Sequence, residues 1–368
     1  MSKITAFIRS QPVLTAALAA AVITVFLIPP DREYLSYINF SVLIELFSLM
    51  TAIAGLRTAG IFEKMTAFLL KKAGNIRTIG AALTLLCFFS AMAVTNDVAL
   101  LTFVPLTLLV FGGKGDDKEL ILTIVLETAA ANLGGMLTPV GNPQNLFIYE
   151  KYGLTAGEFA QTMLPTGGIC LAVMLLLLLL LPAKKAAVPE QENTPIVKKT
   201  AIACSVLFLV CLLTVFKVIP DILCLAAAVI TALAVDRKML AKVDYSLIAT
   251  FVFFFVFVGN IARIDAVREL FSEILPGKEI IVSALLSQVI SNVPAAVMLS
   301  GFTGKGTELL LGVNIGGFGT LIASLASLIS FQLYRKTENA QSGRYMLVFS
   351  AVNFGMLIFL LILHSFVL

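Results

Sequence analysis

Tryptophan and histidine are almost absent from this sequence, and charged residues are scarce. The 368 residues include no Trp and a single His, His364, and only 13% are Asp, Glu, Lys or Arg. One histidine cannot form an HExxH zinc motif, and it argues against a Ser-His-Asp triad. No segment has the GxxxxGK[ST] spacing of a phosphate-binding loop, so the sequence shows no ATP-hydrolysing site of that kind. We therefore expect no catalytic residues and no enzymatic activity.

Cysteine is also sparse, and its placement excludes redox or metal motifs. No pair has CxxC spacing, and every cysteine lies in an apolar run. Such residues are typical of small buried hydrophobes, so we predict neither disulfides nor a bound metal cofactor. The five residues are Cys87, Cys170, Cys204, Cys211 and Cys224.

What the sequence has in excess is apolar side chains, which make up 59% of it. A soluble domain carries about a quarter charged residues, and a surplus of this size cannot be hidden inside one water-facing globule. The composition predicts an all-α polytopic membrane protein whose partner is the lipid bilayer. The basic residues border apolar runs and form no nucleic-acid face.

Seven apolar runs predict uninterrupted spans, because a helix needs roughly 20 residues to cross the bilayer. The first follows Lys3 and Arg9 but lacks a cleavage site, so we expect a retained span and not a signal peptide. The predicted spans are 12–29, 38–56, 158–182, 200–217, 219–235, 244–261 and 344–366.

Four further apolar segments are interrupted by polar residues, Gly or Pro. Segments 79–111 and 279–302 break at Thr95–Asp97 and Ser291–Pro294, and we interpret them as re-entrant hairpins. Segments 118–149 and 307–334 contain Gly-rich stretches and are interpreted as broken transmembrane helices. A break in hydrocarbon exposes backbone groups, at several kcal/mol each, unless it lines a buried or wet cavity. The four breaks therefore predict a binding site inside the membrane.

The distribution of basic residues predicts the orientation in the membrane. With a cytoplasmic N-terminus and two re-entrant hairpins, only seven of the 26 Lys and Arg residues fall outside, as the positive-inside rule expects. The C-terminus is then external, and the protein is expected in the cytoplasmic (bacterial inner) membrane. The seven are Arg32, Lys151, Lys217, Arg263, Arg268, Lys278 and Lys305.

The two halves of the sequence resemble each other across the polar linker 183–199. LAAAVIT occurs at 18–24 and again at 225–231, and NLGG at 132–135 is matched by NIGG at 314–317. We therefore predict two repeats, 1–182 and 200–368. The predicted topology makes them inverted, the arrangement in which secondary transporters place a substrate site between discontinuous helices. Span 200–217 has no partner in the first half.

The tip of the first predicted hairpin, Thr95-Asn96-Asp97, offers a hydroxyl, an amide and a carboxylate. An ionised Asp near mid-bilayer costs roughly 2.5–3.5 kcal/mol or more, so it needs Na⁺, a proton or helix-end N–H groups. With a helix expected to start near Val98, Asp97 could act only as its N-cap. We favour a role for Asp97 in ion or substrate binding, because capping alone would not explain why the chain forms a re-entrant hairpin here.

The other breaks offer weaker ligands. Ser291 and Asn292 supply oxygen atoms at the second tip, but Val293 stands where Asp97 stood. NLGGMLTPVGNPQN at 132–145 has glycines that let a ligand approach and prolines that leave carbonyls free. NIGGFGTLIAS at 314–324 is its counterpart, with helix–helix packing through small residues as the alternative.

Two acidic residues lie inside predicted spans. Glu45 and Glu127 could each carry a proton or cation, or could bond to a neighbouring helix. Arg57, Lys217 and Arg263 lie at span ends and are expected to extend to the interface. Because the four interrupted segments lack Lys and Arg, an anion would be held by helix N-termini, hydroxyls and amides beside a cation.

These motifs resemble the ion-transporter superfamily of divalent anion–sodium symporters, citrate transporters, arsenite permeases, NhaD-type antiporters and the melanosomal P protein. The resemblance covers nearly the whole chain and is most specific at 92–110, 132–145 and 291–324. The tips read Thr-Asn-Asp and Ser-Asn-Val where the symporters have Ser-Asn-Thr, and Asn-Asp before an apolar helix looks more like the arsenite permeases and P protein. The resemblance implies homodimers that move a transport domain against a fixed scaffold.

The resemblance also implies which residues bind. Asn96 and Asn292 take the role of the tip asparagines, and we expect any Na⁺ site at Thr95, Asn96, Asp97 and Asn142. The expected substrate and ion ligands are Thr95, Asn96, Asp97, Gly134, Gly135, Thr138, Gly141, Asn142, Pro143, Ser291, Asn292, Gly316, Gly317 and Thr320.

The sequence thus predicts an elevator-type secondary transporter of a small anion, such as a carboxylate or oxyanion, coupled to Na⁺ or H⁺ and needing no other cofactor. One alternative is Na⁺/H⁺ antiport without an organic anion, with Asp97, Glu45 or Glu127 as carriers. A second is an arsenite or antimonite efflux permease that serves a soluble ATPase.

Overall fold

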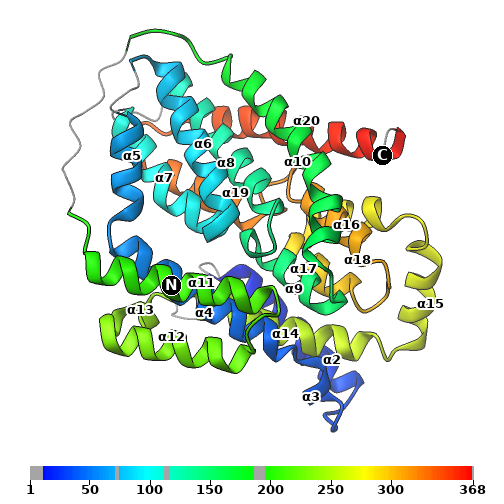
Figure 1. Cartoon of the computed structure of the whole chain (residues 1–368). Coiled ribbons are helices and arrows are strands. Elements are labelled where there is room, and N and C mark those ends of the chain that lie inside the picture. The colour runs from blue at the N-terminus through cyan, green and yellow to red at the C-terminus, as the bar shows by residue number, and fades with distance from the viewer. Residues whose placement is uncertain (1–10, 71–73, 112–116, 186–194, 367–368) are drawn as a thin grey trace.

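The structure, a computed structural model, describes residues 11–70, 74–111, 117–185 and 195–366 (Figure 1). These ranges are helical, without a β-strand, as predicted. The predicted cytoplasmic N-terminal residues 1–10 and most of the linker lie outside the described residues.

The helices of the first half run from α2 to α10. Their bounds are α2 Pro12–Leu27, α3 Tyr34–Tyr37, α4 Phe40–Thr58, α5 Ile61–Leu70, α6 Ile76–Val94, α7 Asn96–Val110, α8 Lys118–Met136, the 3₁₀ turn η1 Pro139–Gly141, α9 Pro143–Tyr152 and α10 Ala156–Leu178. Helix α11, Lys198–Val215, follows the linker. The second half holds α12 Asp221–Val235, α13 Lys238–Ala241, α14 Tyr245–Ile261, α15 Asp265–Ile274, α16 Glu279–Ile290, α17 Asn292–Leu299, α18 Gly306–Ile315, α19 Leu325–Tyr334 and α20 Ser342–Phe366.

The order of helices in the first half recurs in the second. Each half begins with the same four helices, α2–α5 in the first half and α12–α15 in the second. They are a span of 16 or 15 residues, a single helical turn of four residues, a long helix, and an amphipathic helix of ten residues. A helix pair broken at one residue follows in both, as α6–α7 and α16–α17. Helix α11 stands between the halves without a counterpart.

Six helices of the described chain are long and apolar enough to cross a membrane: α4, α6, α8, α10, α11 and α20. A seventh span is present if α14 and α15, bent by 96°, count as one. The predicted spans 12–29 and 219–235 form the shorter helices α2 and α12, of 16 and 15 residues. Helix α2 ends before Pro29-Pro30, since proline cannot continue a helix. The polytopic all-α class is confirmed.

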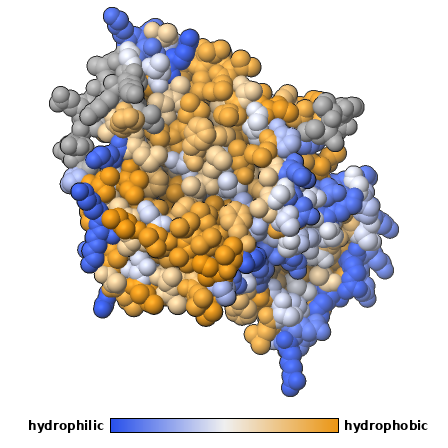
Figure 2. Space-filling view, viewed as in Figure 1, coloured by the Kyte–Doolittle hydropathy of each residue, from blue (hydrophilic) through white to orange (hydrophobic). Residues whose placement is uncertain are grey.

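The surface agrees with this class. Figure 2 shows hydrophobic residues over much of one face, with hydrophilic residues gathered mainly at its edges. On α11 and α12, Ile202, Ile222 and Ile230 are each about two-thirds exposed. In water this surface would be an aggregation liability, whereas lipid tails accept it.

The helices form two bundles that we name by size. The small bundle contains α2, α4, α11, α12 and α14, with α2 packed on α14 and α4 on α11 and α12. The large bundle contains α6–α10 and α16–α20, with α6 on α8, α16 on α18, α7 on α19 and α9 on α17. Helices α5 and α15 join the bundles along the chain and lie at opposite edges of the molecule (Figure 1).

The helices break at the residues that the sequence indicates. Helix α6 gives way to α7 at Thr95, with φ 76° and ψ 150°, and α16 gives way to α17 at Ser291, with φ 76° and ψ 155°. This backbone region is nearly restricted to glycine and costs about 1–3 kcal/mol for other residues. A residue keeps this conformation only where the surrounding structure enforces it. The surrounding structure therefore constrains both tips.

An ion pair joins the loop before α3 to the end of α14. Arg263 Nη1 lies 2.8 Å from Asp31 Oδ2 and also donates to Tyr37 Oη at 2.9 Å. Arg263 therefore does more than extend to the interface. Hydrogen bonding from this guanidinium lowers the pKa of Asp31 below its usual value.

A lowered folded-state pKa makes this contribution to stability sensitive to acid. The stabilisation is present above the unfolded pKa of about 3.9 and is lost as the pH falls through the folded value. We expect wild type to melt above Asp31→Asn at neutral pH, and the difference to vanish in strong acid. Thermal unfolding of detergent-purified protein from pH 8 to about 2 measures this. The more exposed Glu33, paired with Arg263 at 3.5 Å, is the control: Glu33→Gln should matter less. A difference that grows on acidification would contradict the assignment.

Candidate functional site

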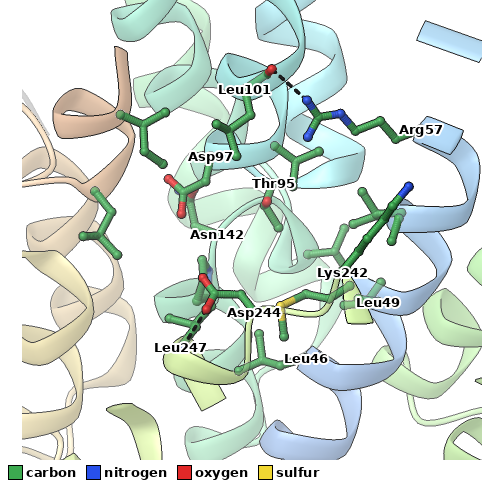
Figure 3. A pocket seen from close by; sticks show the side chains of 18 of the residues that line it. Leu46, Leu49, Arg57, Thr95, Asp97, Leu101, Asn142, Lys242, Asp244 and Leu247 are labelled. Carbon is green, nitrogen blue, oxygen red and sulfur yellow. Dashed lines mark hydrogen bonds between the residues drawn. The ribbon is translucent and has the colours of Figure 1, made fainter. Parts of the chain in front are cut away.

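A cavity of about 740 Å³ lies where the two bundles meet (Figure 3). Helix α4 of the small bundle forms one wall, and the first helix break and the start of α9 in the large bundle form the opposite wall. The residues that line it include Leu46, Leu49, Ile53, Arg57, Glu63, Thr95, Asp97, Val98, Leu101, Val140, Asn142, Pro143, Leu146, Lys242, Asp244, Leu247 and Leu325.

The first tip brings its polar side chains to this cavity. Helix α7 begins at Asn96, not near Val98, so Asp97 is the second residue of the helix and is not its N-cap. The side chain of Asn96 accepts a hydrogen bond from the Asp97 backbone N–H at 2.9 Å. The half-buried carboxylate of Asp97 faces the cavity beside Thr95 (Figure 3), and no ion pair holds it within the described residues.

Asn142 is the second polar group of the site. It lies between the 3₁₀ turn η1 and helix α9, is 2% exposed and lines the cavity with Pro143. Its Nδ2 donates weakly to Asn314 Oδ1 at 3.4 Å, but its Oδ1 has no hydrogen-bond partner. This oxygen is enclosed by the protein beside Gly135, and a buried acceptor without a donor costs about 1–3 kcal/mol.

Behind the cavity, a chain of buried amides connects the two halves of the sequence. Asn96 Nδ2 donates to Asn132 Oδ1 at 3.0 Å, and Ser324 Oγ donates to the same oxygen at 3.0 Å. Asn314 Nδ2 donates to Asn145 Oδ1 at 2.7 Å. These contacts fix the first tip to α8, and they fix α8 and α9 to α18 and the loop that follows it.

The second tip is buried differently. Asn292 and Ser291 are 4% and 1% exposed, and the Asn292 backbone N–H donates to the Ala323 carbonyl at 2.9 Å. Neither residue is among those that line the large cavity. Val293 and Pro294 instead line a smaller cavity of about 140 Å³, which shares Asp244 with the larger one. The first tip therefore contributes a carboxylate, Asp97, whereas the second tip has Val293 in its place.

Several predicted ligand residues lie in helix packing instead. A Cβ on Gly134 would collide with the Phe88 carbonyl of α6, and a Cβ on Gly316 would meet Ser287 of α16 at 2.7 Å. These glycines let α8 and α18 approach their neighbours closely. The hydroxyl of Thr138 donates to the Met92 carbonyl, and that of Thr320 to the Gln288 carbonyl at 2.9 Å.

The remaining predicted glycines surround the amides. A Cβ on Gly135 would lie 2.5 Å from Asn142 Oδ1, and one on Gly317 would lie 3.2 Å from Asn292 Nδ2. Gly141 packs on Gly135 and on the Ala91 carbonyl. They leave room for the side chains of the site and do not line the large cavity themselves.

Glu45 and Glu127 lie away from the cavity lining. Glu45, 1% exposed, pairs with Lys217 at 3.4 Å, and Lys217 also pairs with Glu150 of α9. Glu127 accepts a hydrogen bond from Thr107 Oγ1 at 2.5 Å, while its second oxygen has no partner. The Glu127 contact fits the alternative in which the carboxylate bonds to a neighbouring helix, and Glu45 bonds instead to the loop between α11 and α12.

Four charged residues of the cavity were not expected there. Glu63, Arg57, Lys242 and Asp244 come from α4, α5 and the loop before α14. The sequence places Arg57 at a span end, where extension to the interface was predicted; in the structure it faces the cavity. The only available signal was that these residues border spans.

A cleft between two helical bundles, together with six or seven segments of the described residues that are long and apolar enough to cross a membrane, fits a polytopic membrane transporter. The chain belongs to the citrate transporter family, whose model matches residues 4–304. It is 34% identical over 319 residues to the uncharacterised transporter MJ0456 of Methanocaldococcus jannaschii, with 86% of each chain covered. It is 31% identical over 316 residues to the inner membrane protein YbiR of Escherichia coli, with 84% of each covered.

The fold is similar to that of a solved transporter. The crystal structure of the YdaH transporter of Alcanivorax borkumensis, described as having an unusual topology, superimposes with a TM-score of 0.51 at 15% identity. The match covers 89% of this chain and 85% of the other. Membership of the ion-transporter superfamily, predicted from the tip and loop motifs, is confirmed.

Proposed function

We propose that this protein is a secondary active transporter that moves a small anion across the cytoplasmic membrane, coupled to Na⁺ or H⁺. The observation that carries the proposal is the cavity between the bundles, which Asp97 faces from the first helix break and which Asn142 also lines. Because no phosphate-binding loop is present in the sequence, an ion gradient is the expected energy source.

The coupling cation would bind at the first tip. Thr95 and Asp97 bring a hydroxyl and a carboxylate, both hard oxygen donors, to one wall of the cavity, and Asn142 lines the same wall. Such donors suit hard cations, and the Asp97 charge offsets the desolvation of the ion. A proton on Asp97 would supply the same neutralisation, so this geometry serves either coupling ion. Asn96 orients the tip through its bond to Asn132.

The anion would bind beside the cation. Helices α7 and α9 both begin at the cavity, and their N-termini favour negative charge. The positive charges among the lining residues come from Arg57 and Lys242 on the opposite wall. A bound cation and these two groups together could balance a multivalent carboxylate or oxyanion.

Transport would proceed by movement of the large bundle against the small one. Both helix breaks belong to the large bundle. Few helix pairs connect the two bundles, chiefly α14 with α17 and α4 with α9. The recurring helix order supports two inverted repeats, with α6–α7 and α16–α17 as re-entrant hairpins. Arg57 and Lys242 lie in predicted cytoplasmic segments, so this conformation would face the cytoplasm. We expect the working unit to be a homodimer.

The test is transport by the purified protein in liposomes. Radiolabelled citrate, succinate, sulfate and arsenite are offered with and without an inward Na⁺ or H⁺ gradient. We expect gradient-driven accumulation of at least one anion. If none accumulates under either gradient, the anion proposal fails.

A second candidate is Na⁺/H⁺ antiport without an anion. Three carboxylates, Asp97, Asp244 and Glu63, line the cavity against two basic residues, an excess that favours cations. An internal pH dye that responds to external Na⁺ or Li⁺ in the absence of any permeant organic anion would favour this candidate. Arsenite accumulation alone would favour the efflux permease.

A further inference from the structure

Helix α7, which carries Asp97, has a proline in its interior. Pro105 lies in the middle of the helix Asn96–Val110. It has no N–H to donate to the carbonyl of Leu101, four residues earlier, and its ring pushes that carbonyl away from the helix axis. The freed carbonyl borders the large cavity and is open to another donor.

That donor comes from the other bundle. Arg57, in the last turn of α4, donates from Nη2 to the Leu101 carbonyl at 3.0 Å (Figure 3). Both residues line the cavity. No carboxylate pairs with this guanidinium among the described residues, so the bond to Leu101 is the contact that the structure records for it. One proline in the large bundle thus creates the acceptor for an arginine of the small bundle.

The opposite end of α4 makes a second contact between bundles. Glu45, near the start of the helix, pairs with Lys217, which also pairs with Glu150 of α9. Glu45 and Arg57 are separated by 12 residues, or about 18 Å along a helix. The large bundle is therefore attached at both ends of α4, and a movement past this helix must break the attachments.

We infer that Arg57 is a positioning residue of the transport cycle. By donating to the carbonyl that Pro105 leaves free, it holds the helix of the first tip against α4 while the cavity is open, and it must release that helix when the large bundle moves. The inference rests on the proposed alternating-access function. The second tip has no such attachment, because the residue that corresponds to Arg57 through the match of Gly55 with Gly259 is Ile261.

The test reads the conformation directly and needs no substrate. A reporter cysteine replaces Leu247, which lines the cavity from α14. The five native cysteines are buried and give little background. In liposomes, a membrane-impermeant maleimide labels the reporter at a rate that follows the open population. We expect Arg57→Gln to slow labelling about three- to ten-fold, the range for one solvent-exposed hydrogen bond of ordinary net strength. Arg57→Lys should restore part of the rate.

Pro105→Ala supplies a second variant that is not expected to unfold the protein. It restores the N–H that competes with Arg57 for the Leu101 carbonyl and removes a helix breaker. It should slow labelling like Arg57→Gln. The double variant should be no slower than either single one, because both remove the same contact.

Arg77→Gln is the matched control. Arg77 also donates to backbone carbonyls, Leu181 at 2.7 Å and Leu179 at 3.1 Å, but all three residues belong to the large bundle and its border. It should leave labelling unchanged. Unaltered labelling in Arg57→Gln, additive effects in the double variant, or equal slowing by Arg77→Gln would each overturn the inference. A failure of anion transport in the liposome assay would leave this result standing.

Discussion

Replacement of Asp97 with Asn is expected to reduce the affinity for the coupling ion by about ten-fold or more. Asn keeps the size of the side chain and one oxygen acceptor but removes the charge, and a charge pair in a partly desolvated site is worth several kcal/mol. Asp97 faces the cavity without an ion pair among the described residues, and it is the carboxylate that the first helix break contributes to the lining. Initial rates of anion uptake in liposomes, measured against Na⁺ concentration and against pH, report the change.

The control for this variant lies across the same cavity. Asp244 also lines it, but its carboxylate is exposed and caps α14 by accepting from the Leu247 backbone N–H at 3.0 Å. Asp244→Asn should therefore leave the ion dependence nearly intact. An Asp97→Asn protein with wild-type ion dependence and rate would remove Asp97 from the coupling mechanism.

The largest effect on stability is expected at Gly134. A methyl group there would overlap the Phe88 carbonyl oxygen, and neither the α6 backbone nor α8, all of whose residues from Leu120 to Met136 are buried or nearly so, can move aside freely. Overpacking of this kind costs about 1–3 kcal/mol, and more when the obstacle is backbone. We expect Gly134→Ala to lower the melting temperature clearly or to prevent recovery of folded protein, measured by thermal unfolding in detergent.

Gly355 provides the comparison. It lies within α20, and a Cβ there would meet nothing within 4 Å. Gly355→Ala should leave the melting temperature unchanged or raise it, because alanine favours a helix by up to about 1 kcal/mol over glycine. Equal melting temperatures for the two variants would show that α8 and α6 are not held at this contact.

The helix breaks could be predicted from the sequence because their signals are local. Proline, glycine and asparagine at 132–145 and at 291–294 disfavour a continuous helix whatever surrounds them, and the structure breaks the helices there. The apolar composition likewise determines the membrane class. The start of α7 was misplaced by two residues, because Asn96 satisfies the Asp97 N–H itself and so enters the helix.

The walls of the cavity could not be predicted in the same way. Arg57, Lys242 and Asp244 come from separate segments that meet the first tip only in the folded chain. Their sequence neighbours show only span ends, which border water in any membrane protein. Glycine poses a similar problem, since Gly134 and Gly135 are adjacent in the sequence, yet one contacts α6 and the other makes room for Asn142.

The shared backbone conformation of Thr95 and Ser291 has a consequence for selectivity. Residues in so unfavourable a region stay there only because hydrogen bonds and packing leave them no alternative. The two tips are therefore stiff before any substrate arrives, and the first tip has little conformational freedom left to lose when an ion binds there. Such a protein would discriminate among ions by size, because the spacing of its oxygen atoms is fixed. It would also exchange ions quickly, because no loop must be ordered before an ion binds.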